Sequence, residues 1–209
     1  MFSKRFIIAL IIGGIIGINS SVFAAANPFS DVPAKHWAYD YVVMLANRVI
    51  IEGYGEGTFR GDRTITRYEA ATIISKTLKT KYFSKDDDSA LPFSDVTENH
   101  WAYSSVKVSS GMGIIKGYDD KTFRGDRYIT RYEMAQMLYN FLKANLGDYK
   151  AGANPFADIS DNHWAKNAVI ILASKGIIEG YGDSKFRGDR NITRYEASAM
   201  ISKTILTKS

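Results

Sequence analysis

The residues with the most chemical potential recur three times along the chain. All three histidines and all three tryptophans stand at equivalent places, and Trp37, Trp101 and Trp164 are 64 and 63 residues apart. A longer stretch repeats with them, as FRGDRTITRYE, FRGDRYITRYE and FRGDRNITRYE, in which ten of eleven letters agree. Any chemistry assigned to one copy must therefore make sense in all three.

The histidines suggest one possible chemistry, a metal centre on a threefold axis. His36, His100 and His163 would have to converge, and metal-bound histidines are normally oriented by nearby carboxylates. No such set of acids accompanies them, and each histidine stands at the start of an expected helix. The chain also lacks cysteine and has no nucleophile–base, paired-acid or phosphate-loop motif. The sequence therefore predicts a protein that is not an enzyme and that uses neither a metal nor a cofactor.

A second possible chemistry is cell adhesion, because the triplet Arg-Gly-Asp begins at Arg60, Arg124 and Arg187. Recognition of that triplet by an integrin-type receptor requires an exposed loop tip. Here the triplet is embedded in a repeated structural loop, so the motif alone does not favour adhesion.

The motif ITRYE predicts how a helix begins in each copy. Thr66 suits the N-cap position and Glu69 stands three residues later, which is the capping-box arrangement; Thr130 and Thr193 repeat it. The residue after each threonine is an arginine, and a cation in the first helical turn opposes the helix dipole. A locally unfavourable choice made three times predicts a role outside the helix.

Two roles are open for these arginines, Arg67, Arg131 and Arg194. In the first, each forms an ion pair with an acid of a neighbouring copy, and the candidate acids are Asp31, Asp95 and Asp158. In the second, the guanidinium and the free N–H groups of the helix terminus bind an anion, such as a carboxylate or a phosphate. The second role predicts that replacing the arginines leaves folding nearly unchanged.

Helical periodicity predicts the elements that position these side chains. An apolar face in the first copy comprises Trp37, Tyr41, Val42, Leu45 and Ala46. The third copy repeats this face, whereas serines and a glycine dilute it over 101–112 in the second. Gly113 and Gly176 stand where a left-handed cap ends the helix, and Val49 at the equivalent place should be strained. A tryptophan at the start of such a helix more often packs in a core than faces a groove.

The repeats predict the fold. They cover residues 27–78, 92–142 and 155–205, and polar connectors separate them. One helix pair cannot bury both of its apolar stripes alone, whereas three pairs around a common axis can. We therefore predict an all-α fold of three helix–loop–helix units with pseudo-threefold symmetry, forming one compact unit over 27–205.

The N-terminus predicts export. Lys4 and Arg5 precede an apolar run of 13 residues, and Val22-Phe23-Ala24 follows a short polar stretch. This layout is typical of a signal peptide, over residues 1–24, with cleavage after Ala24 or, as a second choice, after Ala26. Removing Lys4 and Arg5 leaves 25 basic side chains against 22 acidic ones, an excess too small to predict a nucleic-acid partner. After cleavage no segment is expected to insert in a membrane.

Taken together, these motifs resemble the S-layer homology repeat. Its usual form carries F-x-D-V, H-W-A, G-Y-x-x-G-T-F and I-T-R-A-E, and the first copy here reads FSDV, HWA, GYGEGTF and ITRYE. Two departures occur in every copy. The usual proline after F-R is Gly61, Gly125 or Gly188, and the usual alanine of I-T-R-A-E is Tyr68, Tyr132 or Tyr195.

The resemblance implies a three-pronged spindle with a central three-helix bundle and grooves between neighbouring repeats. It implies that the protein anchors exported proteins non-covalently to the bacterial cell wall or cell surface, on the periplasmic side where an outer membrane exists. The implied ligand is a pyruvylated secondary cell-wall polymer or a modified peptidoglycan, with other envelope proteins as further candidate partners. The implied glycan-binding residues are Arg67, Arg131, Arg194, Asp31, Asp95, Asp158, Trp37, Trp101 and Trp164. The alternative function is a structural subunit of a surface lattice without glycan specificity.

Overall fold

The computed structural model describes residues 26–78 and 91–207. In that part of the chain the regular structure is six α-helices and one short 3-10 turn, Gly55–Gly57, without a β-strand. The helices are α1 Tyr39–Asn47, α2 Arg67–Thr77, α3 Tyr103–Gly111, α4 Arg131–Leu146, α5 Lys166–Ser174 and α6 Arg194–Thr207. The predicted signal peptide, 1–24, lies outside the described residues.

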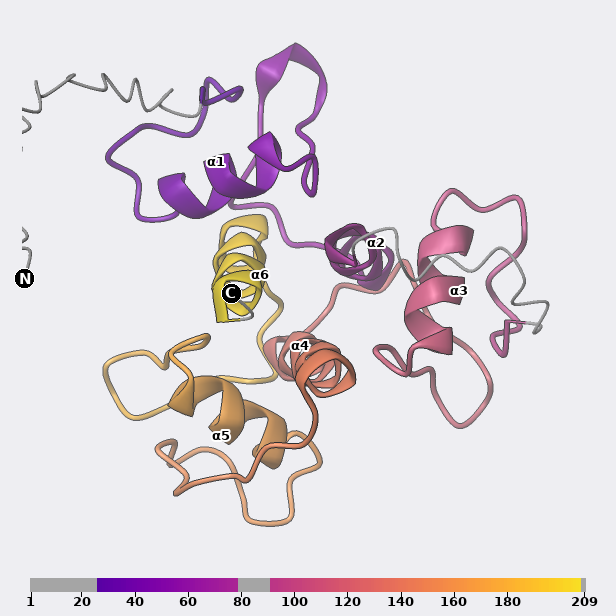
Figure 1. The fold of residues 1–209 in the computed structure, drawn as a ribbon, viewed down its shortest axis with the longest axis vertical. Coiled ribbons are helices and arrows are strands. Elements are labelled where there is room, and N and C mark those ends of the chain that lie inside the picture. The colour runs from indigo at the N-terminus through magenta and orange to yellow at the C-terminus, as the bar shows by residue number, and fades with distance from the viewer. Residues whose placement is uncertain (1–25, 79–90, 208–209) are drawn as a thin grey trace, which may run out of the picture.

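The helices form a central trio surrounded by three lobes. Helices α2, α4 and α6 lie side by side around the centre, and α1, α3 and α5 lie outside them, each with its own loops (Figure 1). The predicted all-α spindle with a three-helix centre is therefore confirmed.

Each outer helix packs mainly on a central helix of another repeat. Helix α3 of the second repeat packs on α2 of the first, α5 packs on α4, and α1 packs on α6 (Figure 1). The central helix of one repeat is thus covered by the outer helix of the next, and the first repeat covers the central helix of the third. A single repeat would leave both of its stripes exposed to water, so stability depends on all three.

A ring of backbone hydrogen bonds joins the repeats just before the central helices. The N–H group of Ile65 donates to the carbonyl oxygen of Ile192 at 3.2 Å, that of Ile192 to Ile129 at 3.1 Å, and that of Ile129 to Ile65 at 3.0 Å. All three isoleucines are completely buried. The three repeats therefore meet in a closed ring, each donating to one neighbour and accepting from the other.

The ends of the outer helices match the predicted caps. Gly113 and Gly176 have φ of +68° and +67°, and Val49 has φ of +57°. A β-branched residue in the left-handed region is strained, so the expectation for Val49 is confirmed.

The two recurrent departures from the usual repeat occupy one contact. A Cβ atom added to Gly125 would lie 2.1 Å from the ring of Tyr68, and the pairs Gly188–Tyr132 and Gly61–Tyr195 show the same clash. Glycine in one repeat therefore makes room for tyrosine from the preceding one, which explains why proline and alanine were replaced together. These three tyrosines pack in the core, where each is about 5% exposed or less.

Candidate binding grooves between repeats

The aspartates of the FSDV and FADI motifs hold the loop that contains the Arg-Gly-Asp triplet. The carboxylate of Asp31 accepts from the N–H groups of Phe59 at 2.6 Å and Arg60 at 2.7 Å. Asp95 and Asp158 accept equivalent pairs of bonds at 2.7–2.8 Å. These bonds lower the pKa of Asp31 although burial acts in the opposite direction. The aspartates are therefore bound within their own repeats and are not the ion-pair partners of the helix-start arginines.

Each helix-start arginine instead reaches into the next repeat. The Nε atom of Arg67 donates to the carbonyl oxygen of Phe123 at 2.9 Å, and Nη2 donates to that of Lys116 at 3.0 Å. Its Nη1 atom forms an ion pair with Glu133 at 3.1 Å. Only 4% of Arg67 is exposed. The ion-pair role is thus present, but the partner is the capping-box glutamate of the neighbouring repeat.

The other two arginines repeat this arrangement and close the circle. Arg131 donates to the carbonyl oxygens of Phe186 and Glu179, at 3.1 and 3.0 Å. Arg194 donates to those of Phe59 and Glu52, at 3.0 and 2.7 Å, and so connects the third repeat to the first. Both arginines are 5% exposed.

The helix-start N–H groups are also occupied. The first two N–H groups of α2, those of Arg67 and Tyr68, donate to carbonyl oxygens of Arg127 and Gly125 at 2.9 Å. The third, that of Glu69, donates to Thr66 Oγ1 at 3.2 Å, as the capping box predicts. The same pattern holds at α4 and α6. An anion therefore finds no free N–H group in the first turn, and the predicted binding mode with these groups is wrong.

Glu133 joins the local polar groups into one network. Its Oε1 atom accepts from Tyr118 at 2.9 Å, from Arg67 and from Arg127, while Oε2 accepts from the N–H group of Thr130 at 2.9 Å. Burial raises the pKa of Glu133, but the Thr130 N–H group and the charge of Arg67 outweigh it and bring the pKa below its usual value. Burial lowers the pKa of Arg67, which the negative charge of Glu133 opposes. The pair is therefore held ionised at neutral pH.

The tryptophans lie outside the core. Trp37, Trp101 and Trp164 are 57%, 63% and 60% exposed, so the expectation that they pack in a core is wrong. The helices begin two residues later than the apolar face suggested, and each tryptophan stands in the turn before its helix. The preceding histidine accepts a hydrogen bond at 3.2 Å from the N–H group of the alanine just before the helix in all three repeats, so each histidine does stand at a helix start, as predicted.

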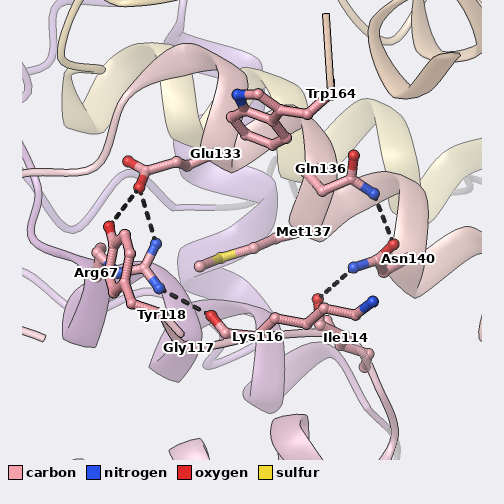
Figure 2. Close-up of a pocket in the computed structure, with 10 residues that line it drawn as sticks. All are labelled: Arg67, Ile114, Lys116, Gly117, Tyr118, Glu133, Gln136, Met137, Asn140 and Trp164. Carbon is pink, nitrogen blue, oxygen red and sulfur yellow. Dashed lines mark hydrogen bonds and ion pairs between the residues drawn. The ribbon is translucent and has the colours of Figure 1, made fainter. Parts of the chain in front are cut away.

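Two grooves between the repeats connect these features. The larger, which we call the Arg67 groove, has a volume of about 440 Å³ (Figure 2). Its lining comes from all three repeats: Arg67, Ile114, Lys116, Gly117, Tyr118, Glu133, Gln136, Met137, Asn140 and Trp164. Figure 2 shows the Arg67–Tyr118–Glu133 network at one end, the Gln136–Asn140 pair at the other, and Trp164 across Met137 from Lys116.

The smaller groove is its counterpart one repeat further on. This Arg131 groove has a volume of about 180 Å³ and is bordered by Trp37, Arg131, Tyr181 and Glu196, together with the pair Glu179 and Lys203. The structure thus brings each of two predicted arginines together with one predicted tryptophan. The predicted aspartates do not line either groove.

The motif analysis missed Lys116, Gln136, Asn140 and the tyrosine of each G-Y pair. Lys116, Gln136 and Asn140 differ from their equivalents in the other repeats, so a search for shared letters passes over them. The tyrosine is shared by all three copies, as Tyr54, Tyr118 and Tyr181, and belongs to a repeated motif to which no role was assigned. A position-by-position comparison of the three copies would have found Lys116, because glutamate occupies its equivalents, Glu52 and Glu179.

Within residues 26–78 and 91–207, no three His, Cys, Asp or Glu side chains gather in a way that could hold a metal ion. The helices described there are also too short or too polar to cross a membrane.

The chain matches the family model described as the S-layer homology domain three times, over residues 28–71, 92–135 and 155–198. It is 37% identical over 166 residues to Cell surface glycoprotein 1 of Acetivibrio thermocellus, a match that covers 76% of this chain and 7% of that protein. It is 33% identical over 180 residues to the Cellulosome-anchoring protein of the same organism, covering 85% and 39%. The S-layer protein sap of Bacillus anthracis is 30% identical over 190 residues, covering 91% and 23%.

This chain spans less than half the length of each of these relatives. Some relatives, such as the Amylopullulanase of Thermoanaerobacterium thermosulfurigenes, are named as enzymes, and the match covers 10% of that protein. The three matches to the family model lie in tandem and together cover more than half of the sequence. The chain belongs to the S-layer homology domain family.

Proposed function

We propose that this protein attaches exported protein to the bacterial cell envelope by binding a cell-wall glycan in the grooves between repeats. The observation that carries the proposal is the exposed tryptophan at the border of each groove. An exposed indole costs free energy in water, and a flat aromatic face above a polar groove suits a sugar ring with apolar C–H groups on one face. The names of the relatives, among them a cellulosome-anchoring protein and an S-layer protein, support the same role.

Within this proposal the predicted residues have different tasks. Trp37, Trp101 and Trp164 contact the sugar. Arg67 and Arg131 line the two grooves, and Arg194 occupies the equivalent position in the third repeat. Most of their donors are committed to the neighbouring repeat, and glutamates offset the charges of Arg67 and Arg131. The aspartates act indirectly, because their carboxylates shape the loop that borders the groove.

Nothing in the site suggests that the bound glycan is cleaved. Glycoside hydrolysis needs a pair of carboxyl groups on either side of the bond. Glu133 is the only acid that lines the Arg67 groove, and it is engaged by two arginines. We therefore propose a binding module, not an enzyme.

A lattice subunit is the second candidate, because several relatives are named S-layer proteins. The match covers only 23% of each of these two, so the part shared with this chain is a minor portion of them. The grooves bordered by exposed tryptophans support a ligand-binding role, and we therefore favour attachment over lattice formation.

The test is co-sedimentation of the mature protein with purified sacculi, before and after acid removal of secondary polymers. Binding that is lost on acid treatment identifies the polymer as ligand, and binding that persists identifies peptidoglycan. Replacing Trp37, Trp101 and Trp164 together by alanine should abolish binding with little change in stability, because these side chains are exposed. Failure of the parent protein to bind either preparation would refute the proposal, and ordered self-assembly in its place would favour the lattice.

A further inference from the structure

The three repeats are not equivalent at the grooves, and the difference lies in two charged positions. In the first repeat Lys76 forms an ion pair with Glu52 at 2.5 Å, and in the third Lys203 pairs with Glu179 at 2.7 Å. In the second repeat the equivalent residues are Asn140 and Lys116. In the second repeat an amide and an exposed ammonium group thus replace a neutral ion pair. Within the described residues, no carboxylate forms an ion pair with the ammonium group of Lys116.

This exchange changes the net charge of the groove. The charged residues lining the Arg131 groove are Arg131, Lys203, Glu179 and Glu196, which sum to zero. Those lining the Arg67 groove are Arg67, Lys116 and Glu133, which leave one positive charge. Because Arg67 and Glu133 are paired with each other, that charge resides on Lys116.

The exchange also coincides with a difference in space. The Arg67 groove has about 440 Å³ and the Arg131 groove about 180 Å³. Cavities that hold a small ligand are usually about 300 Å³ or larger, so only the first of these two is roomy enough for a sugar residue with its substituents.

Polar groups suited to a sugar stand beside the ammonium group. Gln136 Nε2 donates to Asn140 Oδ1 at 2.8 Å, and Asn140 Nδ2 donates to the carbonyl oxygen of Ile114 at 3.0 Å. These two bonds orient both amides and leave further donor and acceptor capacity on Gln136. The equivalents of Gln136 are Thr72 and Ala199, which lack an amide.

We infer that the Arg67 groove is the principal binding site of this chain and that Lys116 selects a carboxylate-bearing saccharide. The ammonium group of Lys116 binds the carboxylate, the Gln136–Asn140 pair binds hydroxyl or amide substituents, and Trp164 covers the ring. The ion pair Glu179–Lys203 makes the Arg131 groove the weaker site, and the ion pair Glu52–Lys76 occupies the ammonium group at the equivalent place in the first repeat. The inference rests on the proposed function and goes beyond it by assigning one groove and one selecting residue.

The experiment exchanges the residues at these two charged positions between the second and third repeats. The double variant Lys116→Glu with Asn140→Lys gives the second repeat the residues of the third. The double variant Glu179→Lys with Lys203→Asn does the reverse. Each new residue already stands at the equivalent position of another repeat, so folding should be retained, and thermal unfolding of each variant checks this. Lys150→Glu, at an exposed position that lines neither groove, lowers the net charge by two units, against one for the first double variant, and is therefore a strict control for the change in charge.

Binding is measured by co-sedimentation with untreated and acid-stripped sacculi, which separates a carboxylate on the secondary polymer from one on peptidoglycan. In the preparation that the parent protein binds, the first double variant should lose at least about tenfold in affinity, because a hydrogen bond between charged partners is lost. Lys150→Glu should bind like the parent. A protein that carries all four substitutions should regain part of the affinity that the first double variant loses.

The outcomes separate the two proposals. If the parent binds sacculi and the first double variant binds equally well, the assignment to Lys116 and the Arg67 groove is wrong while the proposed function stands. If Lys150→Glu loses as much affinity as the first double variant, the effect is one of net charge and the assignment is likewise wrong. If the parent binds neither preparation, both the proposed function and this inference fail.

Discussion

The side chain of a helix-start arginine makes three kinds of contact with the neighbouring repeat. Arg131 satisfies two carbonyl oxygens, lies 3.6 Å from Glu196, and covers the rings of Tyr181 and Phe186 at 5.0 and 4.7 Å. These contacts outweigh the few tenths to about 1 kcal/mol by which a cation disfavours a helix start. The arginine at an unfavourable helix position is therefore explained by contacts between repeats, whatever it adds to ligand binding.

The first prediction follows from this burial. Arg131→Gln should lower the free energy of unfolding by about 3 kcal/mol, because it leaves buried carbonyl oxygens without donors. The control is Arg187→Gln, whose guanidinium is half exposed and pairs with Asp183 at the surface. It should cost less than about 1 kcal/mol. Urea unfolding of both variants measures the difference, and equal effects would show that the contacts between repeats are unimportant.

Val49 offers a prediction of opposite sign. Its φ of +57° costs a non-glycine residue roughly 1–2 kcal/mol, and its side chain is 68% exposed, so it gains little from packing. Val49→Gly should therefore raise stability by about 1 kcal/mol, less the entropy that glycine loses on folding. The matched change Gly113→Val should lower stability by a similar amount, since a Cβ there meets no other atom and adds only strain. Thermal unfolding tests both, and a destabilised Val49→Gly variant would contradict the argument.

At the scale of the elements, the contact between a loop glycine and a helix tyrosine fixes how neighbouring repeats meet. The N–H group of Tyr68 donates to the carbonyl oxygen of Gly125 at 2.9 Å, and its ring lies where a Cβ of Gly125 would be. Neither residue can change without the other. The pair therefore sets the approach of the loop to the start of α2.

A double-mutant cycle tests this coupling. Gly125→Ala alone should be strongly destabilising, by about 3 kcal/mol, because the new methyl group overlaps a buried ring. Tyr68→Ala alone should cost about as much through the cavity that it leaves. The double variant should be more stable than the sum of the two by at least 1 kcal/mol, since the cavity accepts the methyl group. Strict additivity of the unfolding free energies would refute a steric coupling.

The three outer helices differ in how much they bury. Five residues of α5 are buried, whereas in α3 only Val106 and Ser109 are. The hydroxyl group of Ser109 is buried and finds no hydrogen-bond partner in the structure. Burying less apolar surface and leaving a polar group unsatisfied both lower local stability.

Hydrogen exchange should therefore be fastest in α3. Amides of residues 101–112 should exchange more readily than those of 37–48 and 164–175, because local opening there exposes less apolar surface. Ser109→Ala should reduce the difference in exchange rate between α3 and the other two outer helices, because it removes the unsatisfied hydroxyl group. Equal protection of the three segments would contradict the prediction.

How much of this could be predicted depends on whether a signal is local. The capping boxes, the left-handed caps and the strain at Val49 were predicted because they depend on residues a few positions apart. The exposure of Trp37 was not predicted, because the helical pattern in the sequence begins two residues before the helix itself, which starts at Tyr39. The partner of Arg67, Glu133, lies 66 residues away in another repeat, and periodicity within one repeat shows which face is buried but not what covers it.

At the scale of the molecule, every lobe depends on a contact that closes the ring. Helix α1 is covered by α6, and Arg194 bonds to carbonyl oxygens 135 and 142 residues earlier in the chain. The grooves share this dependence, since the Arg67 groove uses Trp164 from the third repeat. Folding and the formation of this groove are thus properties of three repeats together.

Removing one repeat should therefore unfold the remainder. A chain of residues 27–154 keeps α1 to α4 but loses α6, which covers α1, and α5, which covers α4. Two repeats cannot form the ring of bonds among Ile65, Ile129 and Ile192. We expect this fragment to lack a cooperative thermal transition.

The control is a circular permutant that starts at residue 91 and ends at residue 78, with a long Gly/Ser linker between 207 and 26. It retains all three contacts between repeats and should unfold cooperatively near the temperature of the parent. A two-repeat fragment that is monomeric and melts like the parent would show that each repeat is stable without the closed ring.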